Sequence, residues 1–446
     1  MQDPFSHYAP TQTVGVGDAW AVVIGAATFL VPFAFPSLRR DRGAMLIVWA
    51  SLLLHQVAAT VNAFARLVPG GELDALTFHR QGVEWLVDAR LTLGFDGHMY
   101  VQMLGVLYRA FGPSRLLGAQ TSVLAFVLAA GTVSALADEL GVARWRRWIL
   151  AGFALLPTTV FLTSVTLREG LQILFFATAT YWAVRYLRTH SPAALLATVG
   201  SVLALALWHK GLMLMVPLIP LLAVAWPSGR AARRPAGSVA VRRLKRIGLA
   251  LVAIAMVAGL ARFGMRIAMS GTAGGTEVIS ALGQERALEY AAKYRSGGIG
   301  NRARADYGVA LDASSPGRLA VSLPLVYVHY LFAPFPWQVR AAVDLYGAAE
   351  ALARLLLAVG AIVHVARAGP ERRAPLLFCL VLFGAMTFVW ALGTVNYGTA
   401  IRHHLVSNWL LLLLGVPPVV EAARRLAPGR PRPRGVGPAL PHPATT

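Results

Sequence analysis

Carboxylates stand just outside two apolar runs of this chain, where they could do acid–base chemistry next to a membrane. Asp74 follows the apolar run 44–64 after a short link, and Glu169 follows the run 148–164. A carboxylate beside the hydrocarbon layer is well placed to take a proton from the hydroxyl group of an amphiphilic substrate. The structural alternative is that Asp74 caps the N-terminus of the helix that follows. The residue types leave both interpretations open.

Arg168 precedes Glu169 at the boundary between two apolar runs. Ions without partners are costly there, so the two residues could form an interfacial ion pair, or Arg168 could extend toward the headgroups. A guanidinium can also hold a phosphate group through two parallel hydrogen bonds. We favour the phosphate contact and a second functional carboxylate, because both residues are predicted on the same side of the membrane as Asp74.

Further cations follow the same pattern. His209 and Lys210 interrupt the long apolar stretch 192–226, where a turn is needed in any case, and Arg402 and His403 open the last apolar run. An outer arginine runs against the usual positive-inside bias, and an anionic ligand would explain it. Neighbouring histidines point to different faces of a helix, so contact with an anion is favoured over zinc at His403.

The remaining motifs exclude several site classes. Cys379 is the single cysteine, so an intrachain disulfide and a cysteine-based metal site are excluded. The sequence contains no phosphate-binding glycine loop, nucleophile elbow or zincin motif. No cofactor is indicated with certainty, and a requirement for a divalent metal stays open.

The composition predicts the elements that must position these residues. Hydrophobic residues make up 57% of the 446 positions and charged residues 14%, with a mean hydropathy of +0.59. Soluble domains carry about 25% charged residues. The apolar runs approach the length that crosses a bilayer, and no short alternating strands typical of a barrel are found. We predict an all-α polytopic integral membrane protein.

About 11 transmembrane helices are expected, with boundaries uncertain by a few residues. The runs lie near 19–36, 44–64, 115–137, 148–164, 169–187, 192–208, 211–226, 247–263, 343–366, 375–393 and 405–421.

The net charge of +21 does not indicate nucleic-acid binding, because the arginines form short clusters between the apolar runs and near the C-terminus. Alternating crossings place all these clusters on one face, which the positive-inside bias identifies as cytoplasmic. We therefore predict a multi-pass protein of the cell (plasma) membrane with its polar candidates on the non-cytoplasmic side. The clusters begin at Arg39, Arg144, Arg185, Arg230, Arg367 and Arg424.

One apolar segment is predicted not to cross. Residues 319–337 contain Pro324, Pro334 and Pro336, which break helices, and a crossing there would reverse the sidedness of later clusters. We expect a re-entrant or interfacial segment anchored by Tyr330 and Trp337. The predicted units are an extra N-terminal span (1–43), a transmembrane module (44–263) with an outer loop at 65–114, an outer loop (264–342), C-terminal helices (343–423) and a disordered basic cytoplasmic tail (424–446).

Four features resemble the GT-C superfamily of glycosyltransferases that use polyprenyl-phosphate sugars, including its family 39-like bacterial members. Asp74-Ala75-(x)3-His79 resembles the acidic motif of the first outer loop, and residues 100–141 resemble the next helix pair. Pro157-Thr158-Thr159-Val160-Phe161, with Leu167-Arg168-Glu169, is similar to the second acidic loop. Pro334-Phe335-Pro336-Trp337 and Gly398-Thr399-Ala400-Ile401-Arg402 are similar to segments of related polysaccharide proteins.

The resemblance covers most of residues 44–420 and implies a seven-helix module followed by C-terminal helices. The sequence departs from the family in its extra N-terminal span, and in having one aspartate where the first motif has an acidic pair. The resemblance implies an inverting transfer from a polyprenyl-phosphate sugar to a glycan, lipid or protein acceptor. Asp74 would be the base, assisted by Glu169, and His79, Arg168, His209, Lys210, Arg402 and His403 would bind the substrate and its phosphate.

Two other functions remain open. A polysaccharide polymerase or ligase acting on lipid-diphosphate-linked glycans would depend mainly on outer arginines and histidines. A transporter or flippase of lipid-linked sugars would place polar sites near the middle of the bilayer, often with related halves. The sequence shows few central charges and no duplication.

Overall fold

The computed structural model describes residues 14–65, 67–92, 97–227, 292, 295, 305–306 and 309–426. Within these residues all regular secondary structure is helical, and one isolated β-bridge joins Asp306 to Asn396. The all-α prediction is therefore confirmed for the described part. The predicted span 247–263 and most of the basic tail lie outside the described residues.

Six described helical segments are long and apolar enough to cross a membrane, so the protein is a helical membrane protein, while the total of about 11 spans stays a prediction. They comprise α1 (Val16–Thr28) with η2 (Val31–Ala34), α3 (Arg42–Phe64), α6 (Arg115–Glu139), α16 (Ala342–Arg367), α17 (Pro370–Gly393) and α18 (Tyr397–Leu426). Further helices fill the bundle: α2 (Pro36–Arg39), α9 (Glu169–Thr189), α10 (Pro192–Leu207), η4 (Lys210–Leu214) and α11 (Met215–Ala225).

The predicted run 148–164 is not one continuous helix. The chain forms two short helices there, α7 (Arg146–Ala154) and α8 (Pro157–Leu162). Pro157 has no amide hydrogen to continue α7, but it suits the first turn of a new helix. The Ala154 carbonyl at the end of α7 instead accepts a hydrogen bond of 2.5 Å from the Ser51 hydroxyl.

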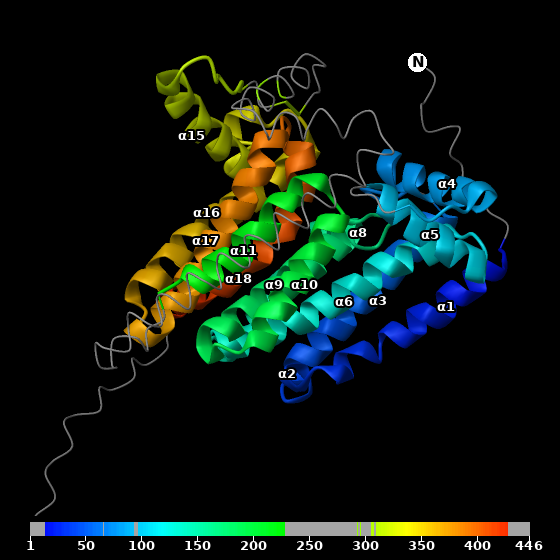
Figure 1. The fold of residues 1–446 in the computed structure, drawn as a ribbon, viewed down its shortest axis with the longest axis horizontal. Helices are drawn as coiled ribbons and strands as arrows, with labels where there is room; N and C mark the ends of the chain where they lie inside the picture. Colours follow the sequence, from blue (N-terminus) through cyan, green and yellow to red (C-terminus); the bar gives the residue numbers. More distant parts are fainter. Residues whose placement is uncertain are drawn as a thin grey trace, which may run out of the picture.

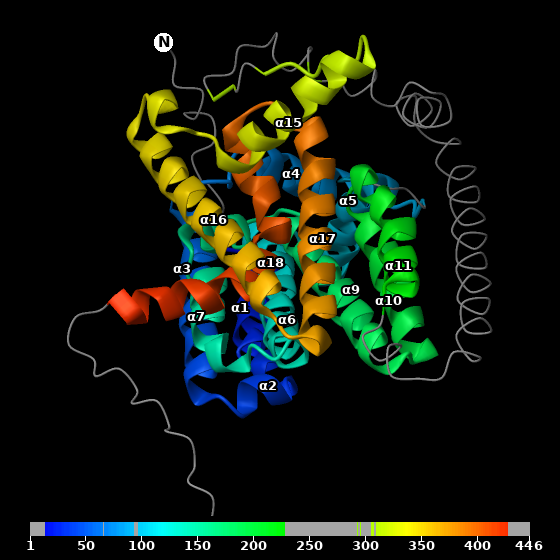
Figure 2. The same cartoon turned by 90° about the vertical axis from the view of Figure 1, so that its left-hand side faces the viewer.

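The helices lie side by side, with shorter helices at the two ends of the bundle (Figure 1). Figure 2 shows α15 (Pro316–Phe332) and α4 (Leu73–Asp88) at one end, which we call the α4 end, and α2 at the opposite, α2 end. The helix α5 (Gly97–Phe111) packs along α4.

The basic clusters that lie within the described residues gather at the α2 end, as predicted, whereas the cluster beginning at Arg230 lies outside the described residues. Side chains from segments far apart in sequence meet there, which requires their turns to lie together. The contacts join Arg147 to Asp41 (2.8 Å), Arg144 to Glu421 (2.5 Å), Arg188 to Glu139 (2.6 Å) and Arg372 to the Gly141 carbonyl (3.1 Å).

The helix expected to follow the Asp74 link is α4, whose first turn contains Asp74. Val83 and Leu86 of this helix pack against the α5 side. Val87 is 92% exposed, and Leu91 lies beyond the helix, which ends at Ala89 in the left-handed conformation. Val87 therefore lies on the outer surface of α4, and Leu91 is not part of the helix.

The proline-rich segment 319–337 differs in detail from its prediction. Pro324 does not break α15, because the helix continues through it to Phe332. Tyr330 is completely buried, with its ring 4.5 Å from that of His404, so its predicted role as an interfacial anchor is wrong. Trp337 is 77% exposed, as an anchor would be. The helix has 17 residues, packs against α16, α17 and α18, and is not among the six candidate spans.

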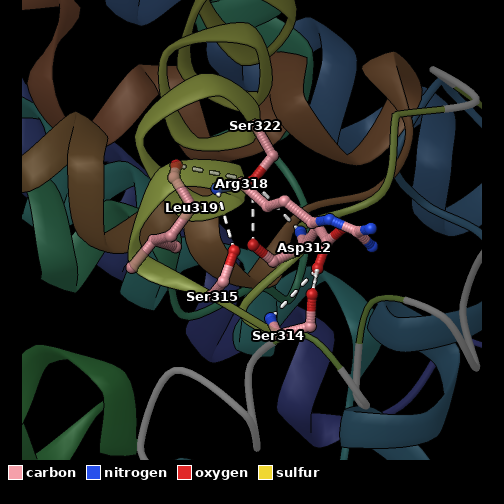
Figure 3. A network of polar contacts seen from close by, with 6 residues as sticks. All are labelled: Asp312, Ser314, Ser315, Arg318, Leu319 and Ser322. Atoms are coloured by element: carbon pink, nitrogen blue, oxygen red, sulfur yellow. Dashed lines mark hydrogen bonds and ion pairs between the residues drawn. The ribbon is translucent and has the colours of Figure 1, made fainter.

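Local hydrogen bonds fix the start of α15 (Figure 3). The Ser315 hydroxyl caps the helix by accepting a hydrogen bond of 3.3 Å from the Arg318 amide. Asp312 accepts from the Ser314 amide at 3.0 Å and pairs with the Arg318 guanidinium at 3.4 Å. Hydrogen bonds from the Ser314 hydroxyl and amide hold the pKa of Asp312 below its usual value.

The helices α16 and α18 cross closely at two glycines, Gly360 and Gly415. A Cβ atom on Gly415 would lie 2.3 Å from the Leu357 carbonyl oxygen, and one on Gly360 would lie 2.9 Å from the Gly415 carbonyl oxygen. Small residues permit such close approach of backbones in membrane bundles. This crossing positions α18, which carries Arg402.

We expect Gly415→Ala to lower the thermal unfolding midpoint of the purified protein, because its methyl group would collide with backbone atoms that cannot move independently. The matched control is Gly200→Ala in α10, where a Cβ atom would meet nothing within 4 Å. Alanine is the better helix former, by about 1 kcal/mol, so the control should be neutral or stabilising. Equal midpoints for the two variants would contradict the close crossing.

Candidate functional site

Arg402 binds two carboxylates that come from distant parts of the chain. Its NH1 atom lies 2.5 Å from Asp74 Oδ2, and its Nε atom lies 2.5 Å from Glu169 Oε1. These residues belong to α18, α4 and α9. The convergence expected for the candidate residues is therefore present for these three, at the α4 end of the bundle.

Asp74 lies in the first turn of α4 but does not cap it. The cap position is Glu72, whose side chain makes no capping hydrogen bond. The carboxylate of Asp74 points instead to Arg402, and its side chain is 55% exposed. The capping alternative is therefore wrong, and Asp74 is the carboxylate of this cluster that an external molecule can reach.

Glu169 is the buried member of the cluster, with a side chain only 2% exposed. It stands in the first turn of α9, where the helix dipole favours a negative charge. Gly170 allows α9 to approach α6 closely, because a Cβ atom there would lie 3.0 Å from the Ser122 carbonyl oxygen. Only one carboxylate oxygen is bonded; Oε2 has no hydrogen-bond partner among the described residues.

Arg168 lies over the ring of Phe78, with 5.7 Å between the guanidinium carbon and the ring centroid. Phe78 in turn meets the ring of Tyr100 edge-on, with centroids 5.1 Å apart. Both Arg168 and Glu169 are close enough to Tyr100 to act on its phenol electrostatically, although burial is the main reason why the pKa of Tyr100 is raised. The guanidinium of Arg168 thus stands beside the carboxylate cluster.

His403 and His209 share one tryptophan. The His403 ring stacks on Trp390 with centroids 3.9 Å apart, and the His209 ring meets Trp390 edge-on at 4.6 Å. Thr394 Oγ1 fixes His403 through a contact of 2.8 Å with Nδ1. These contacts fix the ring of His403, the residue after Arg402 on α18, against Trp390 and Thr394.

His79 turns away from this cluster and toward α5. His79 lies five positions after Asp74 in α4, on a different face, and its Nδ1 contacts the Tyr108 hydroxyl at 2.9 Å. Burial, with a smaller effect of Arg115, lowers the pKa of His79 to about 4, so its ring is neutral near pH 7. Lys210 is exposed at the start of η4. A phosphate contact is therefore not supported for His79.

The sequence did not single out Phe78, Tyr100, Trp390 or Thr394, all of which position predicted site residues. Phe78 is one residue before His79, and Thr394 closes α17 just before the polar segment 396–404. Position along the chain was the only available signal, because aromatic residues are common throughout the apolar runs.

Among the described residues, no group of three or more His, Cys, Asp or Glu side chains could hold a metal ion. The chain matches no protein-family model. No curated protein is similar to it either. The residue geometry is therefore the basis for the functional argument.

We expect Arg402→Met to destabilise the protein by about 3–5 kcal/mol, because it leaves the buried charge of Glu169 without compensation. Glu169→Gln in the same chain should recover much of this loss by removing that charge. The measurement is chemical or thermal unfolding of the single and double variants. Arg318→Met, which breaks an exposed pair with Asp312, is the control and should leave the midpoint unchanged. Additive losses in the double variant would contradict the pairing.

The lowered pKa of His79 predicts a specific pH dependence of stability. Well above the usual histidine pKa of 6.5, the imidazole is neutral whether the chain is folded or unfolded. As the pH falls from 6.5 to about 4, the unfolded chain binds a proton that the folded protein resists, so stability decreases. His79→Gln should show a smaller decrease than the natural protein over this window. Unfolding curves recorded at successive pH values test this, and parallel profiles would contradict it.

Proposed function

We propose that this chain is a membrane glycosyltransferase that moves a sugar from a polyprenyl-phosphate donor to a glycan, lipid or protein acceptor of the cell envelope. We place the reaction on the non-cytoplasmic side of the membrane. The observation that supports this best is the cluster of the exposed Asp74, the buried Glu169 and Arg402, with Arg168 beside it. The likeness of the Asp74 and Glu169 segments to the GT-C superfamily agrees with it.

In this proposal Asp74 is the general base. One carboxylate oxygen takes the proton of the acceptor hydroxyl while the hydroxyl oxygen bonds to the anomeric carbon of the donor. The bond between that carbon and the phosphate oxygen breaks on the opposite face, so the configuration inverts. The exposure of Asp74 supports this role, since the acceptor hydroxyl must come within hydrogen-bond distance.

The arginines would stabilise the leaving phosphate, whose negative charge grows in the transition state. The Nε atom of Arg402 bonds to Glu169 and its NH1 atom bonds to Asp74. A bound phosphate would compete with Asp74 for NH1. Glu169, being buried and bonded to Arg402, orients that guanidinium and is a positioning residue in this proposal. Ions attract more strongly near apolar surroundings than in water, which favours cations at this boundary.

We expect Asp74→Asn to leave a folded protein whose transfer rate is about 10²–10⁴-fold lower, the usual contribution of a general base. Folding should survive because Arg402 keeps its bond to the buried Glu169. Transfer of a radiolabelled sugar from polyprenyl phosphate to cell-envelope extract is the assay. Glu72→Gln is the matched control, since this neighbouring carboxylate caps nothing, and it should retain activity. Near-normal turnover by Asp74→Asn would remove Asp74 from the base role.

A polymerase or ligase of lipid-diphosphate-linked glycans would also use Arg168 and Arg402. Loss of activity in Arg402→Ala does not separate the two functions, because that change leaves Glu169 unpaired in either case. The donor does separate them. Product formed from a diphosphate-linked oligosaccharide, with none from a monophosphate-linked sugar, would favour the polymerase or ligase.

A transporter or flippase is the second candidate, and one observation favours it. Glu350 lies within the candidate span formed by α16 and accepts hydrogen bonds from the hydroxyls of Thr158 and Tyr346. Thr158 stands at the break between α7 and α8, and broken helices beside buried ionisable groups occur in transporters. Movement of a lipid-linked sugar across proteoliposomes without any glycan transfer would favour this function.

A further inference from the structure

An apolar groove with a volume of about 380 Å³ lies between α5, α6 and α9. Of the residues that line it, only Thr121 has a polar side chain. The apolar lining includes Val106 and Leu107 of α5, Leu124 and Leu128 of α6, and Leu171 and Leu174 of α9. Val106 and Leu124 are 48% and 37% exposed, so the groove opens toward the surroundings of the bundle.

The groove includes the first turns of α9, next to Arg168 at the N-terminal end of this helix. Residues three apart on a helix share a face, so Arg168, Leu171 and Leu174 form one row, in which Leu171 and Leu174 line the groove and Arg168 is the next position toward the start of α9. A chain of contacts makes the same connection. Arg168 lies over Phe78, Phe78 meets Tyr100, and the Tyr100 hydroxyl is 3.4 Å from Thr121 Oγ1.

We propose that this groove binds the hydrocarbon chain of the lipid-phosphate donor at the end nearest the phosphate, and that Arg168 binds the phosphate. This assignment rests on the proposed function, because it locates the lipid of the same donor. The hydrocarbon chain of the lipid lies against α5, α6 and α9, and the sugar extends from the phosphate toward Asp74. The remainder of a long chain continues into the bilayer.

Size and charge favour this occupant over others. An α-helix with side chains is about 10–12 Å wide, so two of its turns already fill more space than the 380 Å³ of this groove. The volume suits part of one slender chain rather than the paired chains of a phospholipid. The cation at one end selects an anionic headgroup, since Arg168 is a fixed positive charge with a geometry that matches phosphate.

Photolabelling tests the location. A polyprenyl phosphate with a diazirine on its first isoprene unit is bound to the full chain in nanodiscs, irradiated, and the labelled peptides are identified. We expect labels on groove residues of α5, α6 or α9. Excess undecaprenyl phosphate should remove the labels, whereas excess phosphatidylglycerol should not. Labels on α16 or α17, or removal by phosphatidylglycerol alone, would overturn the assignment.

A substitution that fills the groove tests the energetics. Val106→Trp adds bulk at an exposed lining position and should not disturb the core. We expect undecaprenyl phosphate to bind about tenfold more weakly, the loss expected when two methylene groups leave an apolar site. Leu196→Trp, on the exposed face of α10 at 65% exposure, is the control and should bind normally. Unchanged binding by Val106→Trp would contradict the groove.

The two proposals fail in different ways. Groove labelling without any sugar transfer would refute the transferase and leave the lipid site standing. Sugar transfer with labels elsewhere would refute the groove and leave the transferase standing. Arg168→Ala should weaken undecaprenyl phosphate binding in both the natural and the Val106→Trp backgrounds, and an unchanged affinity would remove Arg168 from the phosphate site.

Discussion

The charge of Glu169 is the constraint on which the candidate site depends. A carboxylate removed from water is costly unless a cation and hydrogen bonds compensate it. Arg402 supplies both, and it also holds Asp74 at the edge of the cluster. The ends of α4, α9 and α18 must therefore come together in the folded protein. A catalytic arrangement at this place would make use of a contact that the fold already requires.

The helix α18 separates two polar regions. Arg402 faces α4 and α9, whereas His404 and Asn408 face the opposite side, where His404 contacts the Tyr330 carbonyl at 2.8 Å and Asn408 contacts Arg354 at 3.3 Å. Residues two apart on a helix point in nearly opposite directions, so one segment serves both regions. The close crossing of α18 with α16 at two glycines holds α18, and with it both polar regions, in position within the bundle.

Chemistry at a membrane boundary needs an apolar surface for the lipid and charges for its headgroup within one small region. Here α9 provides both. Arg168 occupies the N-cap position of the helix and Glu169 is its first residue, and Leu171 and Leu174 in the following turns line the groove. The aromatic rings of Phe78 and Tyr100 lie between the two zones. A substrate with a charged head and a slender chain matches this order of surfaces.

The sequence by itself determined the helical membrane class, the clustering of arginines at one end and the three residues of the carboxylate cluster as candidates, since composition and charge pattern follow directly from solubility in lipid. It could not determine that Pro157 divides a span while Pro324 leaves a helix intact, or that Tyr330 is buried, because these depend on neighbouring helices. Tertiary structure also decided that His79 turns to Tyr108 and that Arg402, rather than Arg168, compensates Glu169. Arg402 and Glu169 are more than 200 residues apart in the sequence. Their pairing is determined by how the helices pack, which local sequence patterns do not predict.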